Sequence, residues 1–329
     1  MITAYVKNQQ GVSAVSLQNI SELPKQTVWL DLLEPSKSEE QIIESFLGIE
    51  VPTSQEIAEI EDSSRFYSRN ENIYLTAALL TRLESSQPSN TDIRFILTPA
   101  TVISVRYVDS RPFRLFTSRM VSGATQSESS DSLLQRMLEV IVDDLADILE
   151  ATALELDTLS HRVFFSASAN NHEDGTDEKV DLKEAIAQIG KYGELISEAR
   201  ISVLNMNRLL IFLSQCGDGW WRPETKVRLQ TLIRDIRSLT EHAAFLSNRV
   251  NFILDGTLGM INIEQNKIIK IFSVAAVVFL PPTLLASIFG MNFRHMPELQ
   301  WDLGYPIAIV LMIVSAILPF LYFKRRGWL

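Results

Sequence analysis

The chain has 329 residues, which is enough for one large soluble domain or two small ones beside a membrane segment. Forty Asp and Glu against 30 Lys and Arg give a formal net charge of −10, which argues against nucleic acid as a partner and favours divalent cations. The single cysteine, Cys216, excludes an intramolecular disulfide and fits a reducing compartment.

The first 118 residues predict a mixed α/β fold. A capped helix is expected over residues 36–48, with Ser36 or Ser38 at its start, Glu39 and Glu40 in its first turn and Gly48 at its exit. Segments rich in β-branched and aromatic residues, separated by turn-forming residues, predict strands at 2–6, 12–17, 27–33, 72–83 and 92–108.

Long helices are predicted after a polar break at residues 119–130. Apolar residues recur at helical spacing over 132–165, and a second long helix is expected over 181–215. No proline occurs between residues 224 and 280, so this run predicts one helix of about 85 Å that continues into the membrane. The predicted domains are therefore an α/β domain at 1–130, a helical stalk at 131–267 and a transmembrane hairpin at 268–329.

Acidic residues gather between positions 131 and 200, where 16 acidic side chains face six basic ones. One interpretation is a solvated helical face, which needs no ligand. The other is a regulatory site for a divalent cation, for which Asp143, Asp144 and Asp147 are the candidates because they fall within two helical turns. The sequence leaves both interpretations open.

Two uncharged apolar stretches, 271–289 and 303–323, predict a membrane hairpin. Nineteen residues cover about 28 Å, close to the roughly 30 Å of a hydrocarbon core. The connecting loop is too short to be a domain. Lys267, Lys270 and the basic residues 324–326 flank the spans, and this charge bias predicts a cell-membrane protein with both termini in the cytoplasm and the loop outside.

One face of the first span carries a row of residues that suits a pore. A single hairpin cannot enclose a pore, but several copies can, and each residue of the row then becomes a ring. The rings near the loop would be hydroxyl-bearing, and the deeper rings would be apolar and could gate by dewetting. The alternative is a stripe that faces lipid or another helix. The row consists of Ile269, Phe272, Ala276, Leu280, Thr283 and Ser287.

The sequence contains none of the catalytic or nucleotide-binding motifs that would indicate an enzyme. The sequence contains no HExxH, no Walker-type phosphate loop, no GxGxxG and no GxSxG. We therefore expect no enzymatic activity and no cofactor other than a transported and regulatory divalent cation.

The segment GMNFRHMPEL between the two spans, together with the ending YFKRRGWL, resembles the CorA family of Mg²⁺ channels. Gly290, Met291 and Asn292 match the family signature Gly-Met-Asn, and Glu298 lies in the matching MPEL. The segments VWLDLLEP at 28–35 and EIEDSSRFY at 59–67 also look like family segments. The resemblance therefore covers nearly the whole chain.

This resemblance implies a funnel-shaped homopentamer with an α/β cytoplasmic domain, a stalk of long helices and a pore lined by the first span. By position, Asn292 would form the ring that binds the hydrated ion at the mouth, and Gly290 would allow the tight turn. Thr283 would form a deeper ring, and Asn266 a ring at the cytoplasmic end of the pore. The inner apolar constriction would consist of Leu280, Phe272 and Ile269.

The chain departs from the family pattern in two places. Arg294 and His295 stand where an acidic residue commonly follows the aromatic residue of the loop, and Pro281-Pro282 adds a proline beside the usual one. Met291 favours this family over its zinc-transporting branch, which typically has isoleucine there. Three functions stay open: a passive Mg²⁺ influx channel gated by intracellular cation, a Zn²⁺, Co²⁺ or Ni²⁺ transporter of the same superfamily, and a membrane-anchored sensor or scaffold.

Overall fold

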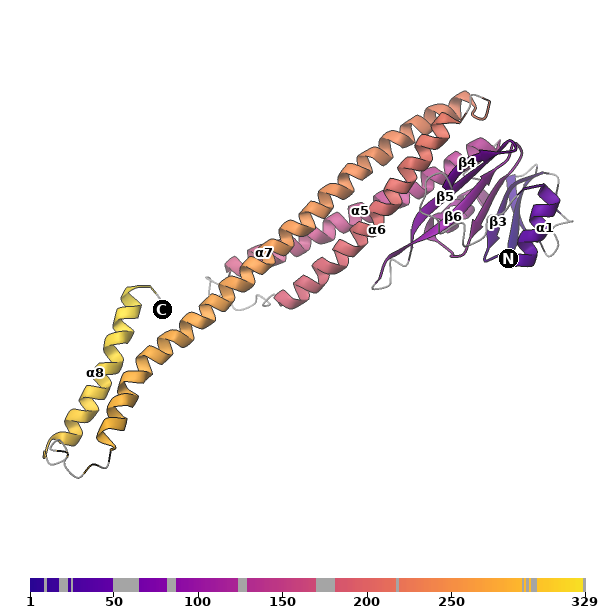
Figure 1. Ribbon diagram of the computed structural model, residues 1–329. Coiled ribbons are helices and arrows are strands. Elements are labelled where there is room, and N and C mark those ends of the chain that lie inside the picture. The colour runs from indigo at the N-terminus through magenta and orange to yellow at the C-terminus, as the bar shows by residue number, and fades with distance from the viewer. Residues whose placement is uncertain are drawn as a thin grey trace. The chain divides into compact units, whose positions relative to one another are not determined.

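The computed structural model describes residues 1–8, 11–17, 23–24, 26–49, 65–81, 87–123, 129–169, 181–216, 219–291, 293, 296 and 301–327. The chain divides into two compact units, Met1–Leu254 and Asp255–Leu329, and each is described by itself (Figure 1). The first contains a sheet and several helices, and the second contains the end of one long helix and a shorter helix.

The described strands of the first unit form one seven-stranded sheet in the order β2-β1-β3-β7-β6-β5-β4. Strands β3 and β7 are parallel, and the other neighbouring pairs are antiparallel. All five predicted strand segments are present. The strands are β1 Ile2–Asn8, β2 Gly11–Leu17, β3 Thr27–Leu33, β4 Phe66–Arg69, β5 Asn72–Thr81, β6 Ser89–Leu97 and β7 Val102–Arg106.

The structure differs from the predicted strands in two respects. The segment expected as one strand at 92–108 is two strands, because a turn closed by the bond from the Thr98 N–H to the Thr101 carbonyl separates β6 from β7. Strand β4 and helix α4, which covers Arg111–Val121, were not predicted.

The two faces of the sheet serve two separate hydrophobic clusters. Helix α1, Lys37–Leu47, contributes Ile43 to the smaller cluster, together with Leu30 and Leu32 of β3. Trp29, whose side chain points to the opposite face, joins the larger cluster with residues of α4, α5 and α6. The α1 boundaries were correctly predicted: Ser36 and Glu39 form a capping box, and Gly48 ends the helix at φ 65°.

A buried polar network joins the parallel strands β3 and β7. The Trp29 indole donates to Ser104 Oγ at 2.9 Å, and the Ser104 hydroxyl donates to Asp31 Oδ1 at 2.6 Å. Arg106 Nη2 donates to Asp31 Oδ2 at 2.8 Å, and the guanidinium also lies 4.8 Å from the Phe113 ring centre. The network satisfies a buried charge pair, which would otherwise be costly inside the core.

Four long helices follow the sheet. The predicted helices at 132–165 and 181–215 are α5, Ser130–Ala169, and α6, Leu182–Gln215. The proline-free run belongs to α7, Pro223–Phe289, which has 67 residues and therefore measures about 100 Å along its axis. Helix α8 covers Gly304–Arg325. By length and composition, α7 and α8 each contain a segment that could cross a membrane, with mean hydropathy 2.1 and 2.4.

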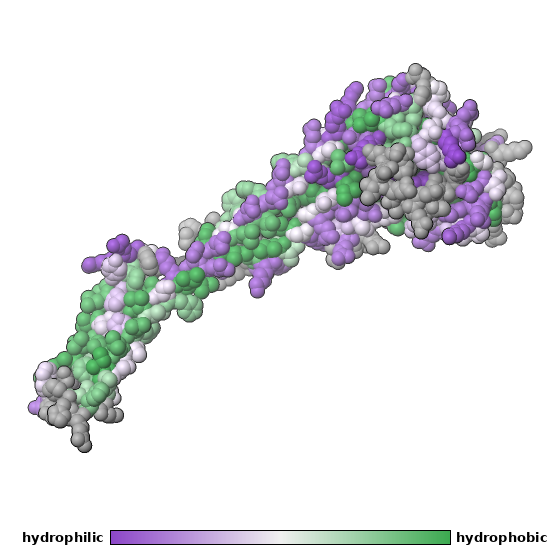
Figure 2. Space-filling model, viewed as in Figure 1, coloured by the Kyte–Doolittle hydropathy of each residue, from purple (hydrophilic) through white to green (hydrophobic). Residues whose placement is uncertain are grey.

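In the second unit, α8 runs antiparallel to the last turns of α7 (Figure 1). The space-filling view shows that this part of the chain is largely covered by hydrophobic side chains (Figure 2). Only 6% of each apolar window is buried within the chain. The unit therefore exposes the kind of surface that soluble proteins bury.

Candidate functional site

The predicted row on α7 is exposed along its whole length. Ile269, Phe272 and Leu280 are 61%, 71% and 66% exposed, and the other members are exposed as well. Successive members lie three or four residues apart, so they share one face of the helix. The members are Ile269, Phe272, Ala276, Leu280, Thr283 and Ser287, and Asn266, predicted as a separate ring at the cytoplasmic end, extends the row by one position and is also exposed.

The opposite face of α7 is the less exposed one. Val274 is only 4% exposed, and Val278, Leu285 and Phe289 are partly covered. At about 100° per residue, this second row lies roughly half a turn around the helix from the first. On α8, Ala308 is 6% exposed, so small and apolar side chains line the packed side of the hairpin. Helix α8 therefore covers the back of α7 and leaves the predicted pore row uncovered.

Thr283, a polar member of the row, forms a hydrogen bond within its own helix. Its hydroxyl donates to the Phe279 carbonyl at 2.8 Å, one turn earlier in the helix. The proton is therefore used inside the helix, and the lone pairs of Oγ1 stay available to accept hydrogen bonds. Water molecules bound to a cation donate such bonds, so a ring of these oxygens suits a hydrated ion.

Gly290 follows the last residue of α7. Its N–H donates to the Ala286 carbonyl at 2.9 Å, and a Cβ at this position would meet the same carbonyl oxygen at 3.1 Å. Glycine therefore permits a close approach that any side chain would crowd. Met291 is 45% exposed. The remaining predicted loop residues, Asn292, Arg294, His295 and Glu298, lie outside the described residues.

The predicted acidic trio on α5 is divided between two environments. Arg111 of α4 pairs with Asp144 at 2.9 Å and with Asp147 at 3.4 Å, and Asp144 is buried. Asp143 lies on the exposed side of α5, where partial desolvation, followed by the charge of the nearby Glu139, raises the pKa of its carboxyl group. Burial also raises the pKa of Asp144, although the Arg111 guanidinium opposes that shift. Within the described ranges, no group of three His, Cys, Asp or Glu is placed to hold a metal ion.

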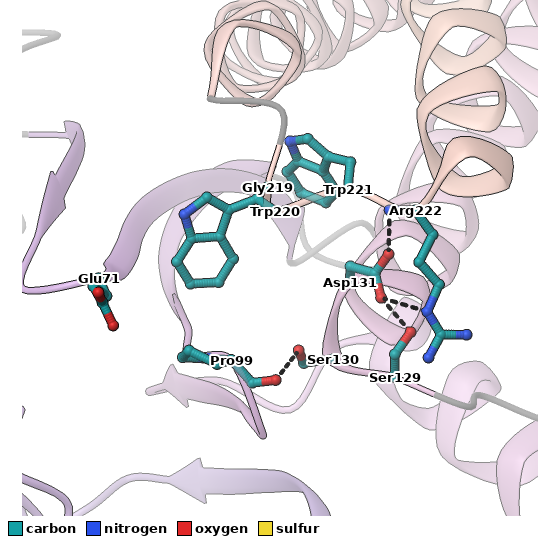
Figure 3. A pocket seen from close by; sticks show the side chains of 9 residues that line it. All are labelled: Glu71, Pro99, Ser129, Ser130, Asp131, Gly219, Trp220, Trp221 and Arg222. Atoms are coloured by element: carbon teal, nitrogen blue, oxygen red, sulfur yellow. Dashed lines mark hydrogen bonds and ion pairs between the residues drawn. The ribbon is translucent and has the colours of Figure 1, made fainter.

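A cavity of about 560 Å³ lies where α5 and α7 begin (Figure 3). Asp131 borders it and accepts hydrogen bonds from the Arg222 N–H at 3.2 Å and from Thr225 Oγ1 at 2.9 Å. Although burial acts to raise its pKa, these bonds and one from Ser129 hold the pKa of Asp131 below its ordinary value. Asp131 thus joins the first turns of two helices, a role that the sequence pattern did not reveal because the partners are 91 and 94 positions away.

Comparison with known proteins identifies the family. The family described as "CorA-like Mg2+ transporter protein" matches residues 24–325. The chain is 33% identical to the magnesium transport protein CorA of Salmonella typhimurium, with 100% of both chains covered. It is also 33% identical over 313 residues to the CorA protein of Haemophilus ducreyi, with 95% of each chain covered.

The chain belongs to the CorA family.

Solved structures of a CorA magnesium transporter and of the CmaX protein share this fold. The complete CorA magnesium transporter of Methanocaldococcus jannaschii matches 100% of the chain with a TM-score of 0.78 at 18% identity. The full-length CmaX protein also matches 100% of the chain, with a TM-score of 0.70 at 13% identity. These likenesses confirm the predicted fold class: an α/β domain, a long helix and two C-terminal apolar helices. At such low identity they show the fold alone.

Proposed function

We propose that this CorA-family chain is a passive influx channel for divalent cations, with Mg²⁺ as its cargo. The observation that carries the proposal is the uncovered row on α7: α8 packs on the opposite face, so the row is free to line a shared axis. The two relatives that align over 95% and 100% of the chain at 33% identity bear the name magnesium transport protein.

The pore requires several copies of the chain. Because one hairpin cannot enclose a channel, the α7 spans of a homopentamer would surround the axis and turn each residue of the row into a ring. Phe272 and Leu280 would form apolar rings that exclude water when narrow. Asn266 and Ile269 would complete the inner end. Membrane lipid would cover α8 on the outside.

The mouth of the pore would select the ion by its hydration shell. Mg²⁺ holds its water tightly and prefers octahedral geometry, so removing that water in a narrow filter would be slow. The amide of Asn292 and the hydroxyl of Thr283 are neutral oxygen donors that can hold the hydrated ion without stripping it. A ring of carboxylates at the same place would bind the ion too firmly to release it.

The membrane potential would drive the flux. With both termini in the cytoplasm and the loop outside, a doubly charged ion moving inward gains about 4.6 kcal/mol per 100 mV of inside-negative potential. No nucleotide is required. Such a strong driving force makes a brake useful, and the acidic window that includes Asp143, Asp144 and Asp147 could supply one by binding Mg²⁺ between neighbouring subunits.

The competing cargo is a transition metal. A ZntB cytoplasmic domain from Vibrio parahaemolyticus matches 79% of the chain with a TM-score of 0.50, which concerns the fold and not the ion. Met291 and the full-length relatives favour Mg²⁺.

Flux through purified protein tests the proposal. The full chain, reconstituted into liposomes with an inside-negative potential, should admit Mg²⁺ reported by an internal dye and should admit little Zn²⁺. Empty liposomes and collapse of the potential serve as controls. Zn²⁺ entry in preference to Mg²⁺ would assign the other cargo. Absence of any cation flux from a homogeneous, folded oligomer would leave the sensor or scaffold as the function.

A further inference from the structure

Basic side chains gather at the end of the hairpin that lies opposite the loop. Lys267 and Lys270 are on α7, and Lys324, Arg325 and Arg326 close α8; all five are exposed. Lys267 lies 22 residues before Phe289, and Arg326 lies 22 residues after Gly304. Both therefore lie about 33 Å along the helix axes from the loop end. A hydrocarbon core is roughly 30 Å thick, so these cations stand at the level of the lipid headgroups.

Few acidic residues of the described chain lie at this end, and Glu264, an exposed residue one turn before Lys267 on α7, is among them. Within the part of the chain that the structure describes, Lys267, Lys324 and Arg325 form no ion pair. After Glu264, the only acidic residue among the described residues is Asp302, which lies at the loop end. Figure 2 shows the hydrophilic side chains at the end of α8 directly beside the hydrophobic surface of the hairpin.

The helix dipole accounts for only part of this cluster. Arg325 and Arg326 lie at the C-terminus of α8, where positive charge is favourable. Lys267, however, lies in the interior of α7, so the end of a helix cannot explain it. The Arg326 side chain is exposed, and its guanidinium lies over the Tyr322 ring at 5.6 Å from the ring centre. Such stacking uses the face of the guanidinium plane, so the N–H donors at its edge stay available to bind a phosphate.

We propose that Lys267, Lys324, Arg325 and Arg326 bind the phosphate of an anionic phospholipid headgroup. Ammonium and guanidinium groups at the membrane surface attract acidic lipids, and arginine binds phosphate with two parallel hydrogen bonds. The adjoining apolar surface of the hairpin accommodates the acyl chains. The proposal rests on the membrane hairpin of the proposed function, and it adds a specific lipid class as a ligand.

The test measures which lipids remain bound to the full-length protein. Protein purified in detergent is mixed with equal amounts of phosphatidylglycerol and phosphatidylcholine, and the retained lipid is counted by native mass spectrometry. We expect roughly tenfold enrichment of phosphatidylglycerol, which the triple variant Lys324→Gln, Arg325→Gln and Arg326→Gln should lose. The matched control is Arg228→Gln, Arg234→Gln and Arg237→Gln, which removes the same charge from an exposed part of α7 in the first unit. It should keep the enrichment.

Two further arms make the result decisive. A charge-conserving variant, Lys324→Arg, Arg325→Lys and Arg326→Lys, should retain the preference, which separates lost charge from lost folding. Millimolar inorganic phosphate should not displace the lipid; displacement would show a free-anion site and overturn the proposal. Equal retention of both lipids by the wild type, or an unchanged preference in the triple glutamine variant, would also overturn it. Mg²⁺ flux in phosphatidylcholine liposomes reports on the proposed function separately, because conduction does not require the acidic lipid.

Discussion

In the sheet and α4 of the first unit the large aromatic side chains lie inside, whereas on α7 in the second unit they lie on the surface of the chain. Trp29, Phe95 and Phe113 are fully or almost fully buried, but Phe272 and Phe279 are about 70% exposed. The first unit also pairs its buried charges internally, as Asp31 and Arg106 do. The second unit leaves its apolar row exposed, and among the described residues Lys267, Lys324 and Arg325 form no ion pair.

This difference shows where each unit obtains its stability. Burial of apolar surface stabilises the first unit within one chain. In the proposed assembly, lipid and other copies of the chain would cover the exposed apolar surface of the second unit. Apolar side chains left in water do not contribute that stabilisation. Substitutions in the first unit should therefore change folding, and substitutions on the α7 row should change flux.

The largest effect is expected from Asn292→Ala. Removing the amide deletes the oxygen ring proposed to hold the hydrated ion, so Mg²⁺ uptake should fall by at least about tenfold. Uptake is measured in liposomes at equal protein content. The melting temperature of the first unit should not change, because residue 292 belongs to the other unit. Wild-type flux in this variant would refute the role assigned to Asn292.

The converse test is Asp31→Ala. This change leaves the buried Arg106 guanidinium without its main partner and should reduce the free energy of unfolding by about 3–5 kcal/mol. Asp109→Ala is the matched control, because Asp109 also pairs with Arg106 but its carboxylate is 48% exposed. The control should cost less than about 1 kcal/mol. Chemical denaturation of the solubilised full chain measures both, and equal losses would contradict the assigned importance of the buried network.

Local sequence signals predicted the features that depend on neighbouring residues. Ser36, Glu39 and Gly48 mark α1 because capping involves residues within one turn of the helix end. The periodicity of α7 likewise predicted a row that the structure leaves exposed. Long-range pairs were not predictable: Arg106 lies 75 positions from Asp31, and Arg111 lies on a helix that no pattern indicated.

The acidic stripe on α5 illustrates the same limit. Sequence spacing placed Asp143, Asp144 and Asp147 together, but it could not reveal that Arg111 pairs with two of them. The break between β6 and β7 was missed because strongly β-forming residues flank the Thr98–Thr101 turn on both sides. Pattern gave the type of most elements, but it missed β4, α4 and the local turn that separates β6 from β7.

A third substitution sharpens the comparison within the second unit. Phe272→Ser places a hydroxyl in a ring proposed to exclude water, so the closed pore should wet more easily and the resting Mg²⁺ leak should rise about threefold or more. Leu318→Ser is the matched control, since Leu318 is exposed on α8, outside the α7 row. Dye-reported leak at high internal Mg²⁺ measures both. Equal leaks would place the gate away from Phe272.

The smallest effect concerns the proposed brake and returns to the first unit. Burial and the charge of Glu139 raise the pKa of Asp143, so its ionised form destabilises the fold at neutral pH. That penalty is relieved as pH falls through the raised pKa, whereas the stability from Asp131, whose pKa is lowered, disappears on acidification. Asp143→Asn should therefore increase the free energy of unfolding at neutral pH, and hence the melting temperature. The gain should be less than about 1 kcal/mol because the side chain is exposed. Asp147→Asn should bring no such gain, since Asp147 pairs with Arg111.

If Mg²⁺ acts by relieving the same repulsion, the rise in melting temperature that it produces should shrink in Asp143→Asn and persist in Asp147→Asn. An undiminished Mg²⁺ response in Asp143→Asn would show that this carboxylate takes no part in the brake.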